Sequence, residues 1–256
     1  MNEPSASSAV RAELEYRERQ LSQDIDFELK KSMAKIHGDG RLKNLPNLRR
    51  IGIRFYGKVL ELGAGSCWLS SQISKIRSVE AVYALDLSKS LLTRIAPLIM
   101  TELEAKTNKI RRISGDFHEL PLKTDFFDVI VMDAALHHAV HPTQVLREVK
   151  RVLKAQGFFL AIREPVLPLW RSRQKNIIGA EERSQGVTEN VWTLSEWKRI
   201  FARSGLKTKF GKATPTHSAK ANKLIKKALR FLFLPMLNKY LFGYYYFFAK
   251  KERPLG

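Results

Sequence analysis

Hydrophobic and polar positions follow two different periods along this chain, and the two periods alternate. Short apolar runs typical of buried strands are separated by stretches with the three-to-four-residue spacing of helices. Helices are predicted to begin at Ser66 and Ser88, to cover 142–153, and to run from a Thr193 cap to Gly205. This alternation is typical of a parallel sheet covered on both faces. The apolar runs predict strands at 58–62, 81–86, 110–114, 129–132, 158–163, 206–212 and 243–250.

The first 53 residues show only the helical period. Apolar residues recur at threes, fours and sevens among charges over 9–37, which predicts one long amphipathic helix ended by Gly38 and Gly40. Residues 42–54 are interpreted as a basic connector containing Pro46. We therefore expect an N-terminal helical cap over 1–53 and one α/β domain over 54–256.

Two alternating glycines follow the first predicted strand. Gly63 and Gly65 lack a Cβ, so a ligand can approach the backbone there, and the next helix begins with free N–H groups. Alone, this turn fits several nucleotide ligands. Asp86, however, ends the second strand 21 residues after Gly65, and an acid at that spacing can accept both hydroxyls of a ribose.

Further polar residues follow the later strands. Gly115-Asp116-Phe117 comes after the third strand, and Asp133 ends the fourth. The carboxyl ends of parallel strands meet at one edge of a sheet, so these groups should line one crevice. Three histidines, His137, His138 and His141, follow Asp133.

As a set, these motifs resemble the class I S-adenosylmethionine (SAM)-dependent methyltransferases, in particular their broad small-molecule "type 11"-like group. The similarity covers roughly Arg54 to Pro165 and rests on Glu-x-Gly-x-Gly, the acid of the second strand, Gly-Asp, and Leu-His-His. It implies a Rossmann-like, doubly wound, seven-stranded sheet with an antiparallel last strand, SAM as cofactor, and an N-terminal helical lid. The chain departs from the pattern at Cys67, where a third glycine usually stands. Cys67 is interpreted as a small packing residue.

The resemblance also assigns roles. Gly63 and Gly65 would approach the methionine part of SAM, Asp86 would bind its ribose, and Asp116 would accept from its adenine amino group. The full expected cofactor set is Glu61, Gly63, Gly65, Asp86, Leu87, Asp116, Phe117 and Asp133.

Candidate acid–base residues lie beyond the fourth and fifth strands. Histidine titrates near neutral pH, so His138 is the first candidate base and His137 the second, while a structural role in the turn stays open. Glu164 follows the fifth strand and is a further candidate. Asp133, His137 and His141 have a spacing compatible with a metal, but a fourth ligand is not apparent, so no metal is expected.

Charge adds a separate feature. The chain carries a net charge of +20, and from Glu196 onward it has 15 basic and two acidic residues. An insertion at 215–242, between the last two strands, combines basic residues with the apolar run 231–234. This pattern favours an anionic membrane surface over RNA, and packing on the domain or on a second subunit stays open.

The sequence thus predicts a SAM-dependent methyltransferase that acts on an oxygen of a small-molecule, glycan or lipid-linked acceptor. An RNA methyltransferase and a non-catalytic SAM-binding partner subunit are the alternatives. RNA is less favoured because the Asn/Asp-Pro-Pro-Tyr/Phe motif is absent. One cysteine and no signal-peptide core indicate a cytoplasmic protein, and the basic insertion suggests a peripheral position on the inner membrane face.

Overall fold

The computed structural model describes residues 6–38, 42, 44–168, 180–184, 187–212 and 243–251. The predicted insertion at 215–242 lies outside these residues, so the expectation about it stays untested. Among the described helices, none has the length and apolar character needed to cross a membrane.

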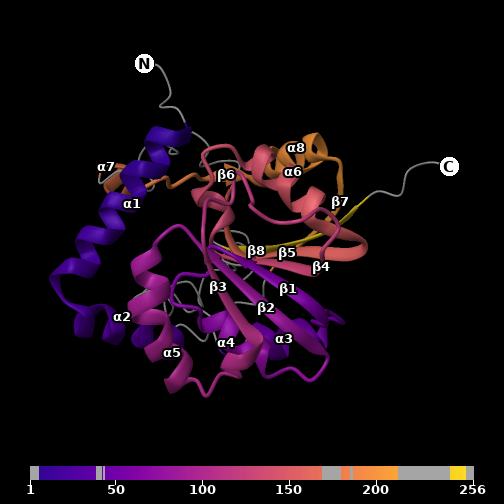
Figure 1. The fold of residues 1–256 in the computed structure, drawn as a ribbon. Coiled ribbons are helices and arrows are strands. Elements are labelled where there is room, and N and C mark those ends of the chain that lie inside the picture. The colour runs from indigo at the N-terminus through magenta and orange to yellow at the C-terminus, as the bar shows by residue number, and fades with distance from the viewer. Residues whose placement is uncertain are drawn as a thin grey trace, which may run out of the picture.

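One twisted sheet organises the described chain (Figure 1). Its strands lie in the order β3-β2-β1-β4-β5-β8-β7, and β8 runs antiparallel to β5 and β7 while the remaining neighbours along this path are parallel. The expected Rossmann-like sheet with an antiparallel last strand is therefore confirmed. The strands are β1 (Gly57–Leu62), β2 (Val79–Asp86), β3 (Ile110–Ser114), β4 (Phe127–Asp133), β5 (Leu153–Leu167), β7 (Leu206–Lys212) and β8 (Gly243–Lys251), with the short β6 (Trp192–Thr193) beside β5.

Helices cover both faces of the sheet. In Figure 1, α6 and α8 lie above it, and α3, α4 and α5 lie below it. The upper core joins Val145 and Leu146 of α6 to Trp197 and Phe201 of α8, and the lower core includes Leu69 of α4. The helices are α3 (Asn44–Arg50), α4 (Trp68–Ser74), α5 (Ala96–Glu102, preceded by the π-helical turn η2, Leu91–Ile95), α6 (Pro142–Val152), α7 (Ala180–Ser184) and α8 (Leu194–Ser204), with 3-10 turns η3 (Thr107–Lys109) and η4 (Leu136–His138).

Several helix ends form as the sequence predicts. The hydroxyl of Ser88 accepts from the N–H of Leu91, which satisfies a donor of the first turn after β2. Thr193 and Glu196 form a reciprocal capping box at the start of α8, and Gly205 ends that helix in a left-handed conformation.

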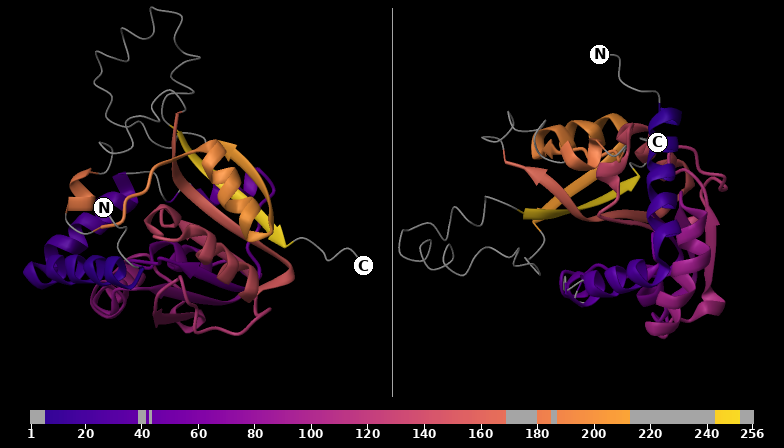
Figure 2. Two further views of the ribbon diagram at one scale, coloured as in Figure 1. Left: turned by 90° about the horizontal axis from the view of Figure 1, so that it is seen from above. Right: turned by 90° about the vertical axis from the view of Figure 1, so that its left-hand side faces the viewer.

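The N-terminal region differs from the prediction. Instead of one helix over 9–37, the chain forms α1 (Ala6–Gln23) and α2 (Ile25–Gly38), because the Asp24 carboxylate accepts from the N–H of Phe27 and caps a new helix. The expected connector contains α3, and Pro46 is tolerated in its first turn, where the N–H has no intrahelical partner. Figure 2 shows α1 upright at one side of the molecule, alongside both layers.

Candidate active site

Three residues of the glycine turn after β1 adopt a left-handed backbone conformation. Gly63, Gly65 and Cys67 have φ values of 70°, 51° and 59°. The N–H of Gly65 donates to Asp86 Oδ2 at 2.7 Å, and the N–H of Ser88 donates to Asp86 Oδ1 at 2.9 Å. The acid that ends β2 therefore fixes the turn that follows β1, which the sequence spacing alone did not reveal.

A cavity of about 440 Å³ lies at the carboxyl ends of the strands, as expected for this topology. Its lining brings together seven of the eight residues expected to bind the cofactor: Gly63, Gly65, Asp86, Leu87, Asp116, Phe117 and Asp133. Glu61 is the exception. It is buried and accepts a hydrogen bond from the Ser70 hydroxyl of α4, so it links β1 to the helix that follows the turn.

Asp116 is organised by a residue that the sequence reasoning missed. Its Oδ1 accepts from the backbone N–H of His118 at 2.8 Å and lies 2.7 Å from His118 Nδ1. Partial burial favours the protonated acid, but the hydrogen bonds from His118 outweigh it and lower the pKa of Asp116. Asp116 therefore presents an ionised carboxylate to the cavity.

Helix α1 closes one side of the cavity. Val10, Glu13 and Arg17 of α1 contribute to the lining, and Glu13 pairs with Arg17 at 3.0 Å. The next residue along the helix, Glu18, accepts hydrogen bonds from the hydroxyls of Ser88 (2.9 Å) and Ser90. The helix is thus attached to the same β2 loop that Asp86 organises.

Buried contacts orient His137, in η4. The backbone N–H groups of Ala135, Leu136 and His137 donate to the Glu164 carboxylate at 3.0–3.1 Å, and His137 Nδ1 lies 2.8 Å from Glu164 Oε2. Burial alone would lower the pKa of His137, but the Glu164 carboxylate, followed by Glu189, raises it. Glu164 is fully buried and outside the cavity lining, so the structure corrects the expectation that it faces the crevice.

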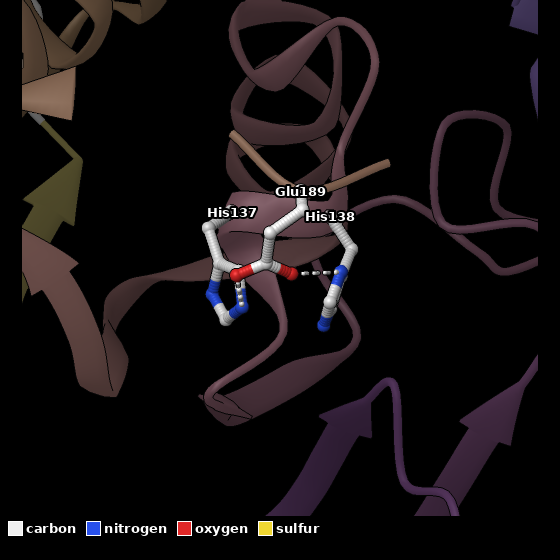
Figure 3. A group of neighbouring side chains, drawn as sticks. All are labelled: His137, His138 and Glu189. Atoms are coloured by element: carbon white, nitrogen blue, oxygen red, sulfur yellow. Dashed lines mark ion pairs between the residues drawn. The ribbon is translucent and has the colours of Figure 1, made fainter. Parts of the chain in front are cut away.

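His138 and Glu189 complete this end of the cavity. His138 Nδ1 donates to the Thr188 carbonyl at 2.6 Å, and burial, followed by the neighbouring His137, lowers the pKa of His138 to about 3. Figure 3 shows the Glu189 carboxylate between the two imidazoles, with one oxygen turned toward each ring. Glu189 Oε1 lies 3.6 Å from His137 Nε2, and Oε2 lies 3.4 Å from His138 Nδ1.

Asp133 reaches the cavity as half of an ion pair. Arg163 donates to both of its carboxylate oxygens, at 2.6 and 2.7 Å. Arg163 has a φ of 58° at the point where the pairing of β5 with β8 shifts register. A local kink of this kind re-aims side chains, and Arg163 is directed into the site.

The lining residues that escaped prediction include Arg17, His118, Arg163 and Glu189. Glu13 and Arg17, four apart on an amphipathic helix, have the pattern of an ordinary surface pair. Glu189 belongs to a segment without periodicity, so the sequence carried no signal for it. His118 was detectable, because it stands two residues after Asp116 at the end of a strand.

Comparisons with known proteins agree with this geometry. Residues 60–161 match the family model described as "Methyltransferase domain". The chain is 28% identical over 154 residues to the uncharacterized methyltransferase YcgJ of Bacillus subtilis (strain 168), covering 58% of this chain and 56% of that protein. It is 24% identical over 127 residues to the demethylmenaquinone methyltransferase of Staphylococcus aureus (strain MRSA252), covering 48% and 51%. The matches span about half the length of these relatives.

Solved structures share the fold over most of the chain. One is a chain from the complex between the Haloferax volcanii Trm112 methyltransferase activator and the putative methyltransferase. It has a TM-score of 0.65 and 19% identity, covering 87% of this chain and 93% of that one. The structure of YcgJ has a TM-score of 0.59 and 20% identity, covering 85% and 100%.

The strand order, the glycine turn and the acid after β2 are those expected for the class I SAM-dependent methyltransferases. The match identifies residues 60–161 as a methyltransferase domain of the type 11 group, a class of proteins that uses SAM.

The cavity suits that cofactor. The position of a Cβ on Gly65 meets no atom within 4 Å, which leaves open space for a ligand beside the turn. Although the whole chain carries +20, the lining contains five carboxylates (Glu13, Asp86, Asp116, Asp133, Glu189) against three cations (Arg17, Lys35, Arg163). A locally negative cavity favours a ligand with a positive sulfonium and ammonium.

Proposed function

We propose that this chain transfers a methyl group from SAM to an oxygen of a small-molecule, glycan or lipid-linked acceptor. The single observation that carries the proposal is one cavity that is lined both by a carboxylate pair, Asp86 and Asp116, and by an imidazole pair, His137 and His138. Bound SAM supplies an electrophilic methyl group. The task of the protein is to align the acceptor oxygen with it and to exclude water.

The chain's own residues divide this task. Asp86 accepts from the ribose hydroxyls through lone pairs not used by Gly65 and Ser88, and Asp116 accepts from the adenine amino group. His137 activates the acceptor oxygen. Its Nδ1–H donates to Glu164, so Nε2 is the nitrogen that takes the proton of the acceptor hydroxyl, and Glu189, 3.6 Å away, stabilises the resulting imidazolium. Glu164 is a positioning residue, because its carboxylate is occupied by η4.

Calorimetric titration with SAM tests the proposal. We expect wild type to bind SAM and Asp86→Asn to bind about 10- to 100-fold more weakly, because hydrogen bonds to a charged acceptor contribute about 1.5–3 kcal/mol. Asp26→Asn is the matched control, since Asp26 is exposed on α2, away from the cavity. No heat of binding in the wild-type protein would contradict the proposal.

Two alternatives keep a motivating observation. The net charge of +20 favours RNA as substrate, and a steep loss of RNA affinity with added salt would support it. Cys67 in the glycine turn motivates a non-catalytic SAM-binding subunit. Methyl transfer by wild type that is lost in Asp86→Asn would exclude that alternative.

A further inference from the structure

We propose that a divalent metal ion binds between His137, His138 and Glu189 at the acceptor end of the cavity. These three residues bring one potential ligand atom each to within 4.8 Å of the others (Figure 3). The expectation of no metal considered a different set, Asp133, His137 and His141. The fold instead adds Glu189, about 50 positions along the chain. Metal binding can be measured without methyl transfer, so this inference does not rest on the proposed reaction.

The separations of the ligand atoms suit a transition metal. The Glu189 carboxylate oxygens lie 3.6 Å from His137 Nε2 and 3.4 Å from His138 Nδ1. Metal–ligand bonds of about 2.0–2.2 Å place two ligand atoms roughly 3–4 Å apart. These two separations fall in that range. Because the three ligand atoms lie up to 4.8 Å apart, the cluster must contract, and His138 Nδ1 must leave the Thr188 carbonyl, to close around an ion.

The surroundings of His137 favour coordination through Nε2. A ligating histidine usually donates its other ring N–H to a carboxylate, which fixes the tautomer and the ring. Glu164 lies 2.8 Å from His137 Nδ1 and is itself held by the three backbone N–H groups of Ala135, Leu136 and His137. The outer shell of a metal site is thus already in place.

Glu189 is also fixed by its neighbours. The N–H of Asn190 donates to the His137 carbonyl at 3.2 Å, and the Asn190 side chain donates to the Ala139 carbonyl at 3.0 Å. These bonds hold the 188–190 backbone across η4. His138 Nδ1 now donates to the Thr188 carbonyl, so coordination through this atom exchanges that hydrogen bond for a metal bond.

The charge balance points the same way. Two carboxylates, Glu164 and Glu189, face the ring of His137 from opposite nitrogens. Arg17 lines the same cavity, but its charge is paired with Glu13. A cation in place of a ring proton would neutralise both acids, and three protein ligands leave coordination positions open for an oxygen donor such as an acceptor hydroxyl.

Cobalt binding tests the site. The full-length protein is stripped with chelator, desalted and titrated with Co²⁺, whose visible absorption reports nitrogen and oxygen ligands, and Zn²⁺ is then added as a competitor. We expect one equivalent of Co²⁺ to bind wild type and to be displaced by Zn²⁺. Glu189→Gln and His138→Gln should each weaken Co²⁺ binding at least about 10-fold. His141→Gln is the matched control, because its side chain lies outside the cluster.

Two results would overturn the inference. One is the absence of visible absorption from wild type with Co²⁺, and the other is absorption that persists unchanged in both Glu189→Gln and His138→Gln. SAM titration and a thermal melt of each variant confirm that it is folded. If one variant fails to fold, the other decides the outcome. Loss of SAM binding by wild type would contradict the proposed function and leave the cobalt result interpretable.

Discussion

Cys67 occupies a backbone position that normally requires glycine. Its φ of 59° lies in the left-handed region, which costs a residue with a Cβ about 1–2 kcal/mol. The side chain is fully buried beside Ala64 and Leu92, and this packing offsets the backbone strain. The departure from the glycine pattern therefore leaves the turn in its expected conformation.

Substitutions at Cys67 should separate these two effects. Cys67→Gly removes the backbone strain but also removes the packing of the thiol, and these two effects oppose each other. We therefore expect the free energy of unfolding to change by less than about 1 kcal/mol, with SAM binding retained. Cys67→Val should destabilise by about 2 kcal/mol or more, because a β-branched residue is strongly disfavoured at this φ. Urea unfolding measures both variants. A Val variant as stable as wild type would refute the assignment of strain.

Glu61 links stability to pH. Burial raises the pKa of Glu61 from 4.5 to about 8, despite the hydrogen bond from Ser70. The folded state therefore binds a proton that the unfolded chain has released between these two values, and stability falls as pH rises from about 5 to about 8. We expect Glu61→Gln to remove this slope, by up to about 1.4 kcal/mol per pH unit, and to be more stable than wild type near pH 8. Thermal melts across this range measure it, and an unchanged slope would count against the assignment.

At the scale of elements, Glu18 is one of the side chains that attach α1 to the site. Glu18 holds the helix to Ser88 and Ser90, next to Asp86. We expect Glu18→Ala to weaken SAM binding by about 10-fold. The variant loses the hydrogen bonds to the charged Glu18 carboxylate, and α1 is then less firmly held over the cavity. Limited trypsin digestion should also cut α1 faster. Glu15→Ala, exposed on the same helix, is the control, and equal affinities for the two variants would contradict this role.

Element boundaries were predictable where local chemistry sets them. The 110–114 and 206–212 strands and the Thr193–Gly205 limits of α8 form as expected, because apolar runs and caps determine them. The break at Asp24 was missed, since the apolar period continues through it while a capping side chain interrupts the helix. Strand β5 is longer than predicted, because Leu153 pairs with Phe127 of β4 at one end and 164–166 pair with β8 at the other.

For the whole molecule, the concentration of positive charge toward the C-terminus leads us to expect binding to anionic membranes. We propose that the basic, apolar 215–242 segment binds anionic lipid, with each Lys or Arg near the surface contributing about 1 kcal/mol. Intact protein should float with phosphatidylserine vesicles and remain behind with neutral phosphatidylcholine vesicles. Replacement of 215–242 by a short Gly/Ser linker should abolish flotation, with SAM binding confirming the fold. Equal recovery of both proteins would contradict the proposal.

The two ends of the site differ in how far the sequence predicted them. The cofactor end was predictable because each strand places its last residues at the same sheet edge, so Gly63, Asp86 and Asp116 were grouped by spacing alone. The acceptor end was not, because Glu189 reaches His137 and His138 from a segment without regular periodicity. Residues that meet through long-range packing leave no local pattern.

The sequence by itself determined the alternation of strands and helices and the glycine turn, because hydrophobic period and strand ends are local properties, and its motifs indicated the cofactor class through their resemblance to a known family. Only the tertiary structure decided which side chains of α1 line the cavity, that Glu164 lies buried against His137, and that Glu189 lies between the two imidazoles. The physical reason is that burial and the approach of distant carboxylates depend on how the layers pack. The same packing raises the pKa of His137 and lowers that of His138.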